Sequence, residues 1–223
     1  LDIIKKYEHA IDYWTSEKDK GIYDAMNKGI TLANGEFISL LNCADYFTDG
    51  ALMEVTNFFL LNSSDVVLTG GITKYDESHD FNLITNQDSF NMLIDYTMPC
   101  NHPSTFVPLN KYKTFGVFNE SFKICGDYDF IYRLYSAGVN FKFSNFLFVR
   151  MQLGGISEVY SSVLQRSIEH YNLRKNKINN FNNLYLSFKL YFIESARHLL
   201  KLIIGKNFLI AYRKKKHYIN TDY

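Results

Sequence analysis

Two neighbouring stretches of this sequence carry residue types that suit the binding of a phosphate group and of a cation. In the first, 15–29, a polar turn leads into a helical stripe of apolar residues, and Gly21 lets the backbone come close to a ligand. The free N–H groups at the start of a helix favour an anion, most often a phosphate. In the second, the apolar segment 36–42 leads to Asp45, an acid beyond the carboxyl end of a predicted strand that is well placed to hold a cation.

The elements that must position these residues alternate between strands and helices. Helices are predicted over residues 2–9, 21–34, 48–61, 89–96 and 127–137, with Gly138 as a helix stop. Extended segments are predicted over residues 11–15, 36–42, 65–72, 105–108 and 141–149, and the polar stretch 73–87 is interpreted as a hairpin or loop. The alternation predicts an α/β fold with a mainly parallel sheet and helices on both faces.

The carboxyl-terminal part of the chain differs from the rest in charge. Helices are predicted from about Ser157 to Lys177 and over 184–204, with a break at 179–183. Residues 165–223 carry 12 Lys or Arg against 3 Asp or Glu, whereas residues 1–164 carry 12 against 20. This basic tail is interpreted either as a helix that lies on a membrane surface or as a helical pair packed on the core with a solvated end. No binding motif for nucleic acid accompanies the charge, so nucleic acid is not an expected partner.

Length and composition fit one α/β domain with an appendage. The chain has 223 residues, of which 47% are hydrophobic and 17% aromatic, enough to bury a sizeable core. Its cysteines, Cys43, Cys100 and Cys125, are odd in number and widely spaced, which argues against a disulfide framework or a cysteine metal site and favours a reducing cytoplasm. No uncharged apolar run reaches the roughly 20 residues that a membrane span requires.

Three motifs extend over the first 150 residues, and together they are specific. The first runs over 16–29 and is followed by Gly35-Glu36. The second reads Leu41-Asn42-Cys43-Ala44-Asp45-Tyr46-Phe47. The third joins His102-Pro103-Ser104-Thr105-Phe106 to Asp127-Tyr128-Asp129 and Arg133-Leu134. In these motifs the chain resembles the family 2 glycosyltransferases, the sugar-nucleotide-dependent enzymes with the GT-A fold, and especially the members that build bacterial surface polysaccharides.

The resemblance implies an organisation and an activity. A GT-A-like domain is expected over residues 1–153 and a basic helical extension over 154–223. Family members begin with a strand and an Asp-Gly-x-Ser-type turn, so about 40 residues that form one strand and its loop are expected to precede Leu1. The implied reaction is an inverting transfer of a sugar from a nucleotide diphosphate donor, with uridine as the expected nucleotide, to a glycan or lipid-linked acceptor. The expected place is the cytoplasm, or the inner face of the cell membrane.

Two aspartates of this chain match the positions of functional carboxylates in the family. Asp45 is expected to bind Mg²⁺ or Mn²⁺ that bridges the two donor phosphates. Ala44 stands where the family usually has another Asp, and the side-chain oxygen of Asn42 is expected to compensate in part. Asp127 is expected to be the base that takes a proton from the acceptor hydroxyl, with Asp129 as its competitor. The alternative for both Asp45 and Asp127 is the capping of a neighbouring helix.

The remaining expected site residues fall into two groups. The donor pocket is expected to involve the first motif and the second, and its predicted members are Asp19, Gly21, Asp24, Asn27, Lys28 and Asn42. Lys20 or Lys28 would touch phosphate or be solvated surface, and Asp24 and Asn27 would fix the turn or the nucleotide. The acceptor side is expected to include His102, Asp129 and Arg133, although His102 could also approach the metal or be structural, and Arg133 could pair with an acid instead. Two other functions stay open: a donor-binding remnant that is inactive, and a nucleotidyltransferase built on a related sheet.

Overall fold

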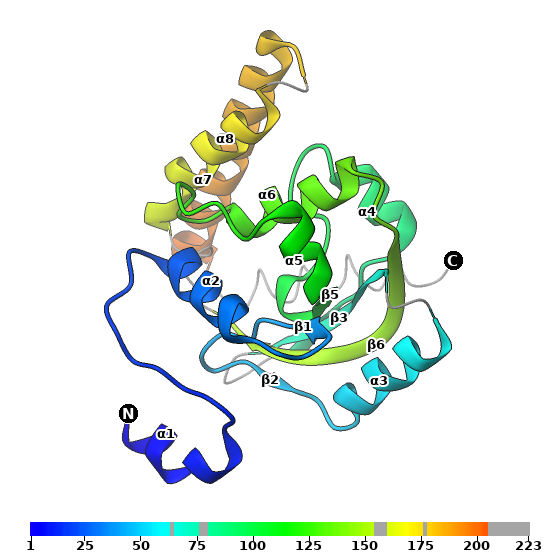
Figure 1. Cartoon of the computed structure of the whole chain (residues 1–223). Helices are drawn as coiled ribbons and strands as arrows, with labels where there is room; N and C mark the ends of the chain where they lie inside the picture. The colour runs from blue at the N-terminus through cyan, green and yellow to red at the C-terminus, as the bar shows by residue number, and fades with distance from the viewer. Residues whose placement is uncertain (63–64, 76–79, 154–159, 176–177, 205–223) are drawn as a thin grey trace.

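A strongly curved sheet forms the centre of the molecule, and helices lie against it on both sides (Figure 1). The computed structural model describes residues 1–62, 65–75, 80–153, 160–175 and 178–204. The strands are β1 (Phe37–Ile38), β2 (Tyr46–Phe47), β3 (Val67–Tyr75), β4 (Asp80–Leu83), β5 (Thr105–Pro108) and β6 (Phe141–Gln152). The helices are α1 (Asp2–Lys6), α2 (Ile22–Leu32), α3 (Ala51–Leu61), α4 (Gln87–Leu93), α5 (Leu109–Phe115), α6 (Gly126–Ser136), α7 (Val163–Arg174) and α8 (Asn180–Ile204).

The central pair of the sheet, β3 and β6, runs parallel, with Val67 opposite Phe141 and Tyr75 opposite Gln152. The strand order is β1-β5-β3-β6-β2, and β4 pairs with the second half of β3. The α/β class and the helices on both faces are confirmed. The prediction of a mainly parallel sheet is corrected, because the other pairings of the described strands are antiparallel. β4 returns directly from β3 as a hairpin, and the short strands β1 and β2 pair antiparallel at the two edges.

Two apolar clusters fill the space between the sheet and its helices. Successive strand residues point to opposite faces, so Val67 belongs to one cluster and Leu68 to the other. The first cluster is formed with α2 and α6, and the second with α3. Gly70 of β3 permits the second packing, because a Cβ atom there would lie 2.3 Å from a ring carbon of Phe148. The sheet therefore holds α2 and α6, which carry the sequence motifs, on one of its faces.

Several elements differ from those that the sequence predicts. The expected strand 36–42 pairs only over Phe37–Ile38, and the chain then runs without regular structure to Asp45. Helix α5 was not expected after Pro108. The break predicted at 179–183 lies earlier in the chain, because α7 ends at Arg174 and α8 already begins at Asn180, where the side chain of Asn179 accepts a hydrogen bond from the N–H of Asn182 at 2.8 Å. The predicted helix start at Ser157 and the basic cluster at 213–216 lie outside the described residues.

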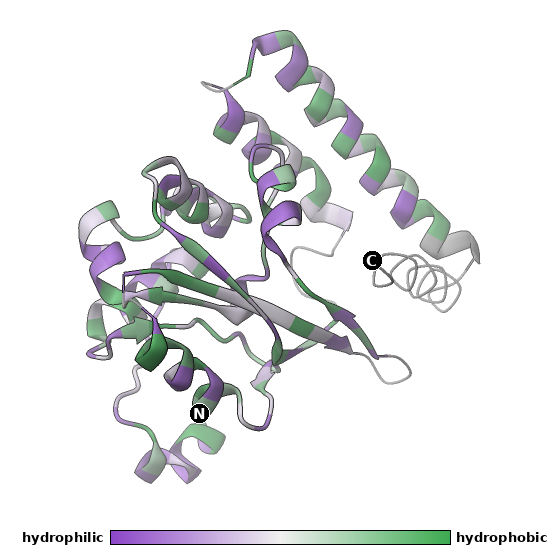
Figure 2. Cartoon of the chain, turned by 90° about the vertical axis from the view of Figure 1, so that its right-hand side faces the viewer, coloured by the Kyte–Doolittle hydropathy of each residue, from purple (hydrophilic) through white to green (hydrophobic). Residues whose placement is uncertain are grey.

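Helices α7 and α8 pack against each other and against the loop that follows α4. Arg174 of α7 is fully buried, and its guanidinium donates to the side chains of Asn183 and Ser187 on α8 and to the carbonyl of Tyr96. Buried charge is tolerated where each N–H group finds an acceptor. The long helix α8 runs along the outside of the molecule (Figure 2). Of the helices in the described ranges, none combines the length and the apolar character needed to cross a bilayer.

The buried His170 of α7 should make the folded protein sensitive to acid. Burial and the neighbouring Arg174 lower the pKa of His170 to about 4, although its ring nitrogen Nδ1 lies 3.2 Å from the Tyr96 carbonyl. The unfolded chain, with an ordinary histidine pKa near 6.5, binds a proton first as the pH falls. We expect the free energy of unfolding to decrease between pH 6.5 and pH 4, by about 3 kcal/mol for this group. Urea denaturation at both pH values should show this loss, and His170→Gln should lose less between the same two values.

Candidate functional site

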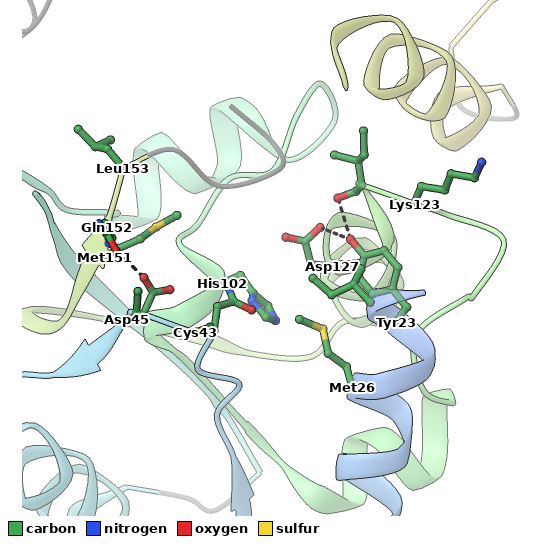
Figure 3. Close-up of a pocket in the computed structure, with 14 residues that line it drawn as sticks. Tyr23, Met26, Cys43, Asp45, His102, Lys123, Asp127, Met151, Gln152 and Leu153 are labelled. Atoms are coloured by element: carbon green, nitrogen blue, oxygen red, sulfur yellow. Dashed lines mark hydrogen bonds between the residues drawn. The ribbon is translucent and has the colours of Figure 1, made fainter. Parts of the chain in front are cut away.

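A cavity of about 630 Å³ opens where the start of α2, the loop 42–45, the start of α6 and the end of β6 meet. Asn42 and Asp45 line it from the loop, and Asp127 lines it from α6. His102, in the 3₁₀ turn His102–Ser104, contributes a further polar wall. In Figure 3 the imidazole of His102 lies between the end of the cavity that holds Asp45 and the end that holds Asp127. Four residues that the sequence singled out therefore line one cavity.

The Asp45 side chain is held by the end of β6. Its Oδ1 accepts a hydrogen bond from the N–H of Gln152 at 3.1 Å, and its own N–H donates to the Asn42 carbonyl at 3.1 Å, which closes a tight turn. Burial raises the pKa of Asp45, although the hydrogen bonds from Gln152 and from the Asn42 side chain and the positive charge of Lys74 oppose that shift. The half-buried carboxylate is thus incompletely compensated by its neighbours, and a cation in the cavity would stabilise its charge.

The same turn places Ala44 in an uncommon backbone conformation. Ala44 has a φ angle of 70°, in the left-handed region, and its carbonyl accepts a hydrogen bond from the Tyr75 hydroxyl at 3.0 Å. Asn and Asp adopt this region more readily than alanine does. An aspartate, which the resembling family usually has here, would therefore suit the backbone at least as well as the alanine does.

The donor atoms around Asp45 fit a cation that is held mainly by its substrate. Within the described ranges, no group of three or more His, Cys, Asp and Glu side chains is arranged to hold a metal ion. The cavity offers one carboxylate from Asp45, one amide oxygen from Asn42 and the imidazole of His102. Mg²⁺ commonly keeps several waters and binds through one or two carboxylates together with the phosphates of a substrate. This donor set fits such an ion, but it does not form a protein cage that would hold one alone.

Asp127 lies in the first turn of α6, where the helix dipole favours a negative charge. Its Oδ1 accepts hydrogen bonds from the N–H of Tyr128 at 2.9 Å and from the Tyr23 hydroxyl at 3.3 Å. The Tyr23 ring packs directly on Gly126, where a Cβ atom would lie 2.8 Å from a ring carbon. The helix begins at Gly126 with Cys125 as its N-cap, so Asp127 is not the cap, and its carboxylate lines the cavity.

His102 is half-buried and neutral at physiological pH. Burial lowers its pKa, and the negative charge of Asp127 opposes the shift without reversing it. Its ring meets the edge of Phe118 at a centroid distance of 6.1 Å. A neutral imidazole offers one hydrogen-bond donor and one acceptor, or a ligand for a metal ion.

The predicted donor residues of the first motif are not among the residues that line this cavity. Asp24 accepts a hydrogen bond from the N–H of Lys20 at 2.8 Å and so ties down the start of α2, which begins after Gly21. Three carboxylates surround the amine of Lys28: Glu17 at 2.7 Å, Asp19 at 2.8 Å and Asp24 at 3.3 Å. This ion cluster raises the pKa of Lys28, with the hydrogen bond to Asp19 as the largest cause. A role of these residues in donor binding stays a prediction.

Asn27 and the pair Asp129–Arg133 also have local partners. The buried amide of Asn27 donates to the Phe118 carbonyl and accepts from the Phe118 N–H, both at 2.9 Å, and so joins α2 to the loop before α6. Arg133 pairs with Asp129 at 3.0 Å, and its guanidinium donates to the carbonyls of Phe115 and Val117. Neither Asp129 nor Arg133 is among the residues that line the cavity. Arg133 therefore has the acid partner that was the alternative to a role on the acceptor side.

Sequence reasoning missed part of the cavity wall. Tyr23 was not among the predicted site residues, yet its hydroxyl contacts Asp127. Met151, Gln152 and Leu153 at the end of β6 also line the cavity, and no sequence pattern marks them. Lys123 lines its rim, but Figure 3 shows the side chain pointing away from the two carboxylates. The position of Tyr23 inside the first motif is the one sequence feature that could have indicated that Tyr23 belongs to the site.

Comparison with known proteins agrees with this arrangement. Residues 1–137 match the family model described as Glycosyl transferase family 2. Over 41 residues the chain is 49% identical to two uncharacterized glycosyltransferases of Mycobacterium tuberculosis, MT1564 of strain CDC 1551 / Oshkosh and Rv1514c of strain H37Rv. That stretch covers 18% of this chain and only 16% of each relative.

Solved structures of TarS from S. aureus have a similar fold. TarS 1-349 aligns with a TM-score of 0.54 at 18% identity, over 90% of this chain and 61% of that one. Its complexes with UDP and with UDP-GlcNAc each align with a TM-score of 0.52, at 17% and 15% identity, over 85% of this chain and 56% and 58% of those. Such identities show a shared fold. Because the family model matches more than half of the sequence, the chain belongs to family 2 of the glycosyltransferases.

Proposed function

We propose that this protein transfers a sugar from a nucleotide diphosphate donor to a hydroxyl group of a glycan or lipid-linked acceptor in the synthesis of cell-surface polysaccharide. The observation that carries the proposal is that Asp45 and Asp127, which are far apart in the sequence, line one cavity of about 630 Å³ with His102 between them. A cavity of this size accommodates a substrate, and each end offers a carboxylate. The cavity thus has one carboxylate that could activate the acceptor hydroxyl and another that could hold a cation beside the donor.

The two carboxylates would act on opposite sides of the transferred sugar. Asp127 accepts the proton of the acceptor hydroxyl, whose oxygen attacks the sugar carbon on the face opposite the nucleotide, so that the configuration inverts in one step. Asp45, with Asn42 and His102 nearby, would hold Mg²⁺ or Mn²⁺ against the diphosphate. The ion's chemistry is to offset the charge that builds on the leaving diphosphate. A single base and no covalent intermediate suffice for this reaction.

The first donors to test are uridine diphosphate sugars. The similar TarS structures include complexes with UDP and with UDP-GlcNAc, and this supports the choice of nucleotide.

The test is an assay of the full chain with a panel of nucleotide sugars, Mn²⁺ and simple glycan or lipid-phosphate acceptors. Release of UDP together with a glycoside of inverted configuration, identified by NMR, is the expected result. A nucleotidyltransferase would instead release pyrophosphate in a parallel assay that supplies a nucleoside triphosphate and a sugar phosphate. Binding of a nucleotide sugar without any turnover would identify a donor-binding remnant. Either of these two results would overturn the proposal.

We also propose that α8 holds the protein at the inner, cytoplasmic face of the membrane. An apolar stripe follows one side of α8, with spacings of three, four or seven residues, and each of its members is more than half exposed: Phe181, Tyr185, Phe188, Phe192 and Leu199. The face that packs on α7 carries the buried Asn183 and Ser187 instead. Figure 2 shows apolar residues, in green, along the length of this helix.

Charge favours a lipid surface over a second copy of the chain as the partner of this stripe. The exposed cations Lys189 and Arg197 lie on the same helix, and residues 165–223 carry 12 basic against 3 acidic residues. Anionic lipid attracts such a segment by about 1 kcal/mol per basic residue, whereas two copies of it would repel each other. An aromatic stripe beside basic residues is typical of helices that lie in the membrane interface.

The double change Phe188→Glu and Phe192→Glu should weaken binding to vesicles of phosphatidylglycerol and phosphatidylcholine by more than about 10-fold, because it removes apolar area and adds negative charge. Co-sedimentation measures the binding. The matched control is Leu164→Glu with Ile168→Glu, which changes exposed apolar residues of α7 outside the stripe. Equal binding by both double variants would contradict the proposal. So would a stripe-dependent dimer in sedimentation velocity without binding to vesicles.

A further inference from the structure

One carboxylate of the carboxyl-terminal helices fastens the segment that leads to Asp127. Glu169 of α7 is only 3% exposed, and it accepts hydrogen bonds from three consecutive backbone N–H groups of that segment. These are Lys123 at 2.8 Å, Ile124 at 3.0 Å and Cys125 at 2.8 Å. Gln165 donates a fourth hydrogen bond at 2.7 Å. Burial opposes the charge of Glu169, but the hydrogen bonds outweigh it and lower its pKa.

The opposite side of the same segment is held by α2. The Tyr23 hydroxyl lies 2.7 Å from the Ile124 carbonyl and 3.3 Å from Oδ1 of Asp127. The backbone of 123–125 thus lies between a carboxylate of α7 and a phenol of α2, and Asp127 follows two residues later. Without Glu169, three buried or half-buried N–H groups would lose their acceptor, and an unpaired buried donor destabilises the conformation that holds it.

We propose that Glu169 is a positioning residue: it fixes the 123–125 backbone and thereby the place of the Asp127 carboxylate in the cavity. The carboxyl-terminal helices then belong to the catalytic unit and are more than an attachment to it. This inference rests on the proposed role of Asp127 as base. A displacement of about 1 Å at a reacting group can cost on the order of 100-fold in rate, so a loosened segment would affect turnover more than donor binding.

The variant Glu169→Gln tests this, because the amide keeps the shape but has a single acceptor oxygen and places N–H groups against N–H groups. We expect kcat to fall by at least about 10-fold, while KM for the nucleotide sugar changes by less than about twofold. The matched control is Glu194→Gln, which removes a carboxylate of α8 that pairs with Arg166 and Arg197 and does not contact the segment. It should leave both constants unchanged.

Cys125 provides a readout that needs no substrate. Its thiol is buried, as is that of Cys100, whereas Cys43 is exposed. In a Cys43→Ser background, maleimide should label Cys125 at least about 10-fold faster when Glu169 is replaced by glutamine, with Cys100 unchanged as the reference for local opening. Labelling is located by mass spectrometry of the peptides. If the Glu169→Gln variant is unfolded, Cys100 and Cys125 should react at the same rate. The labelling is then repeated with Glu169→Asp, which shortens the side chain and keeps its charge.

The outcomes separate this inference from the proposed function. Unchanged labelling of Cys125 overturns the fastening role, whatever the activity. Faster labelling with an unchanged kcat overturns the positioning role. If the unaltered chain transfers no sugar from any donor, the proposed function fails and the role of Asp127 with it, while the labelling still decides whether Glu169 holds the segment.

Discussion

Replacement of Asp127 by asparagine should lower kcat for sugar transfer by about 10³-fold and leave the affinity for the nucleotide sugar within about twofold. General-base catalysis contributes on the order of 10²–10⁴ to a rate. Asparagine keeps the size of the side chain and can still accept hydrogen bonds from Tyr128 and Tyr23, but it cannot take up the acceptor proton. The loss should therefore appear in turnover, measured with saturating donor, and donor binding measured by calorimetry should change little.

The neighbouring Asp129 provides the matched control for this prediction. Asp129 lies on the same helix and carries the same charge, but it pairs with Arg133 and does not line the cavity. Asp129→Asn should reduce stability modestly, through loss of the pairing with Arg133, and should change kcat by less than about fivefold, since a partly exposed ion pair contributes on the order of 1 kcal/mol or less. If Asp129→Asn abolished transfer while Asp127→Asn retained it, the base would be Asp129.

The parts of the site that the sequence could predict are those encoded in contiguous motifs. Asn42 and Asp45 are separated by only two residues in a tight turn, and Asp127 begins a helix whose apolar periodicity is visible in the sequence. Such local signals allowed both carboxylates to be named and predicted the α/β class. They also predicted α2, α3 and α6 to within three residues at their amino-terminal ends.

What the sequence could not predict depends on contacts between distant segments. The direction of strand pairing is one case, because β4 could equally have been a loop and the parallel pair β3–β6 joins residues 74–77 positions apart. Lys28 is another case: its charge suggested phosphate, but the convergence of Glu17, Asp19 and Asp24 on its amine is a property of the folded turn.

Glu169 is the clearest case of a residue whose role depends on contacts that the sequence could not predict. In the sequence it is one acid in a basic helical tail, and nothing in its neighbourhood distinguishes it from Glu194. In the structure it is buried and accepts the N–H groups of residues more than 40 positions earlier, whereas Glu194 pairs with two arginines. The predicted division into residues 1–153 and 154–223 stays a prediction, but these hydrogen bonds mean that the two parts share the segment beside Asp127.

Replacement of Asp45 by asparagine should weaken binding of a nucleotide sugar and reduce kcat/KM by about 10²–10³-fold, and it should remove most of the dependence of both on Mn²⁺. A divalent ion contributes several kcal/mol to stabilising the charge of a leaving diphosphate. The substituted amide would keep the hydrogen bond from Gln152 through its side-chain oxygen but would offer the ion no charge. Calorimetry with Mn²⁺ and with a chelator, together with the transfer assay over a range of Mn²⁺ concentrations, measures the change.

Asp49→Asn is the control that separates this effect from a general loss of negative charge. Asp49 is exposed, lies four residues further along the chain and does not line the cavity. If the two variants weaken donor binding equally, the overall negative charge of residues 1–164 explains the loss, and Asp45 has no specific role in binding. If Asp45→Asn binds the donor as the unaltered chain does, and a chelator has no effect on either, the diphosphate must be held without an ion. Among the described residues that line the cavity, Lys123 is the only lysine or arginine, and its side chain points away from Asp45 in Figure 3, whereas the positive charge of Lys74 acts on Asp45 from outside the lining. That outcome would therefore overturn the role of Asp45 in holding an ion.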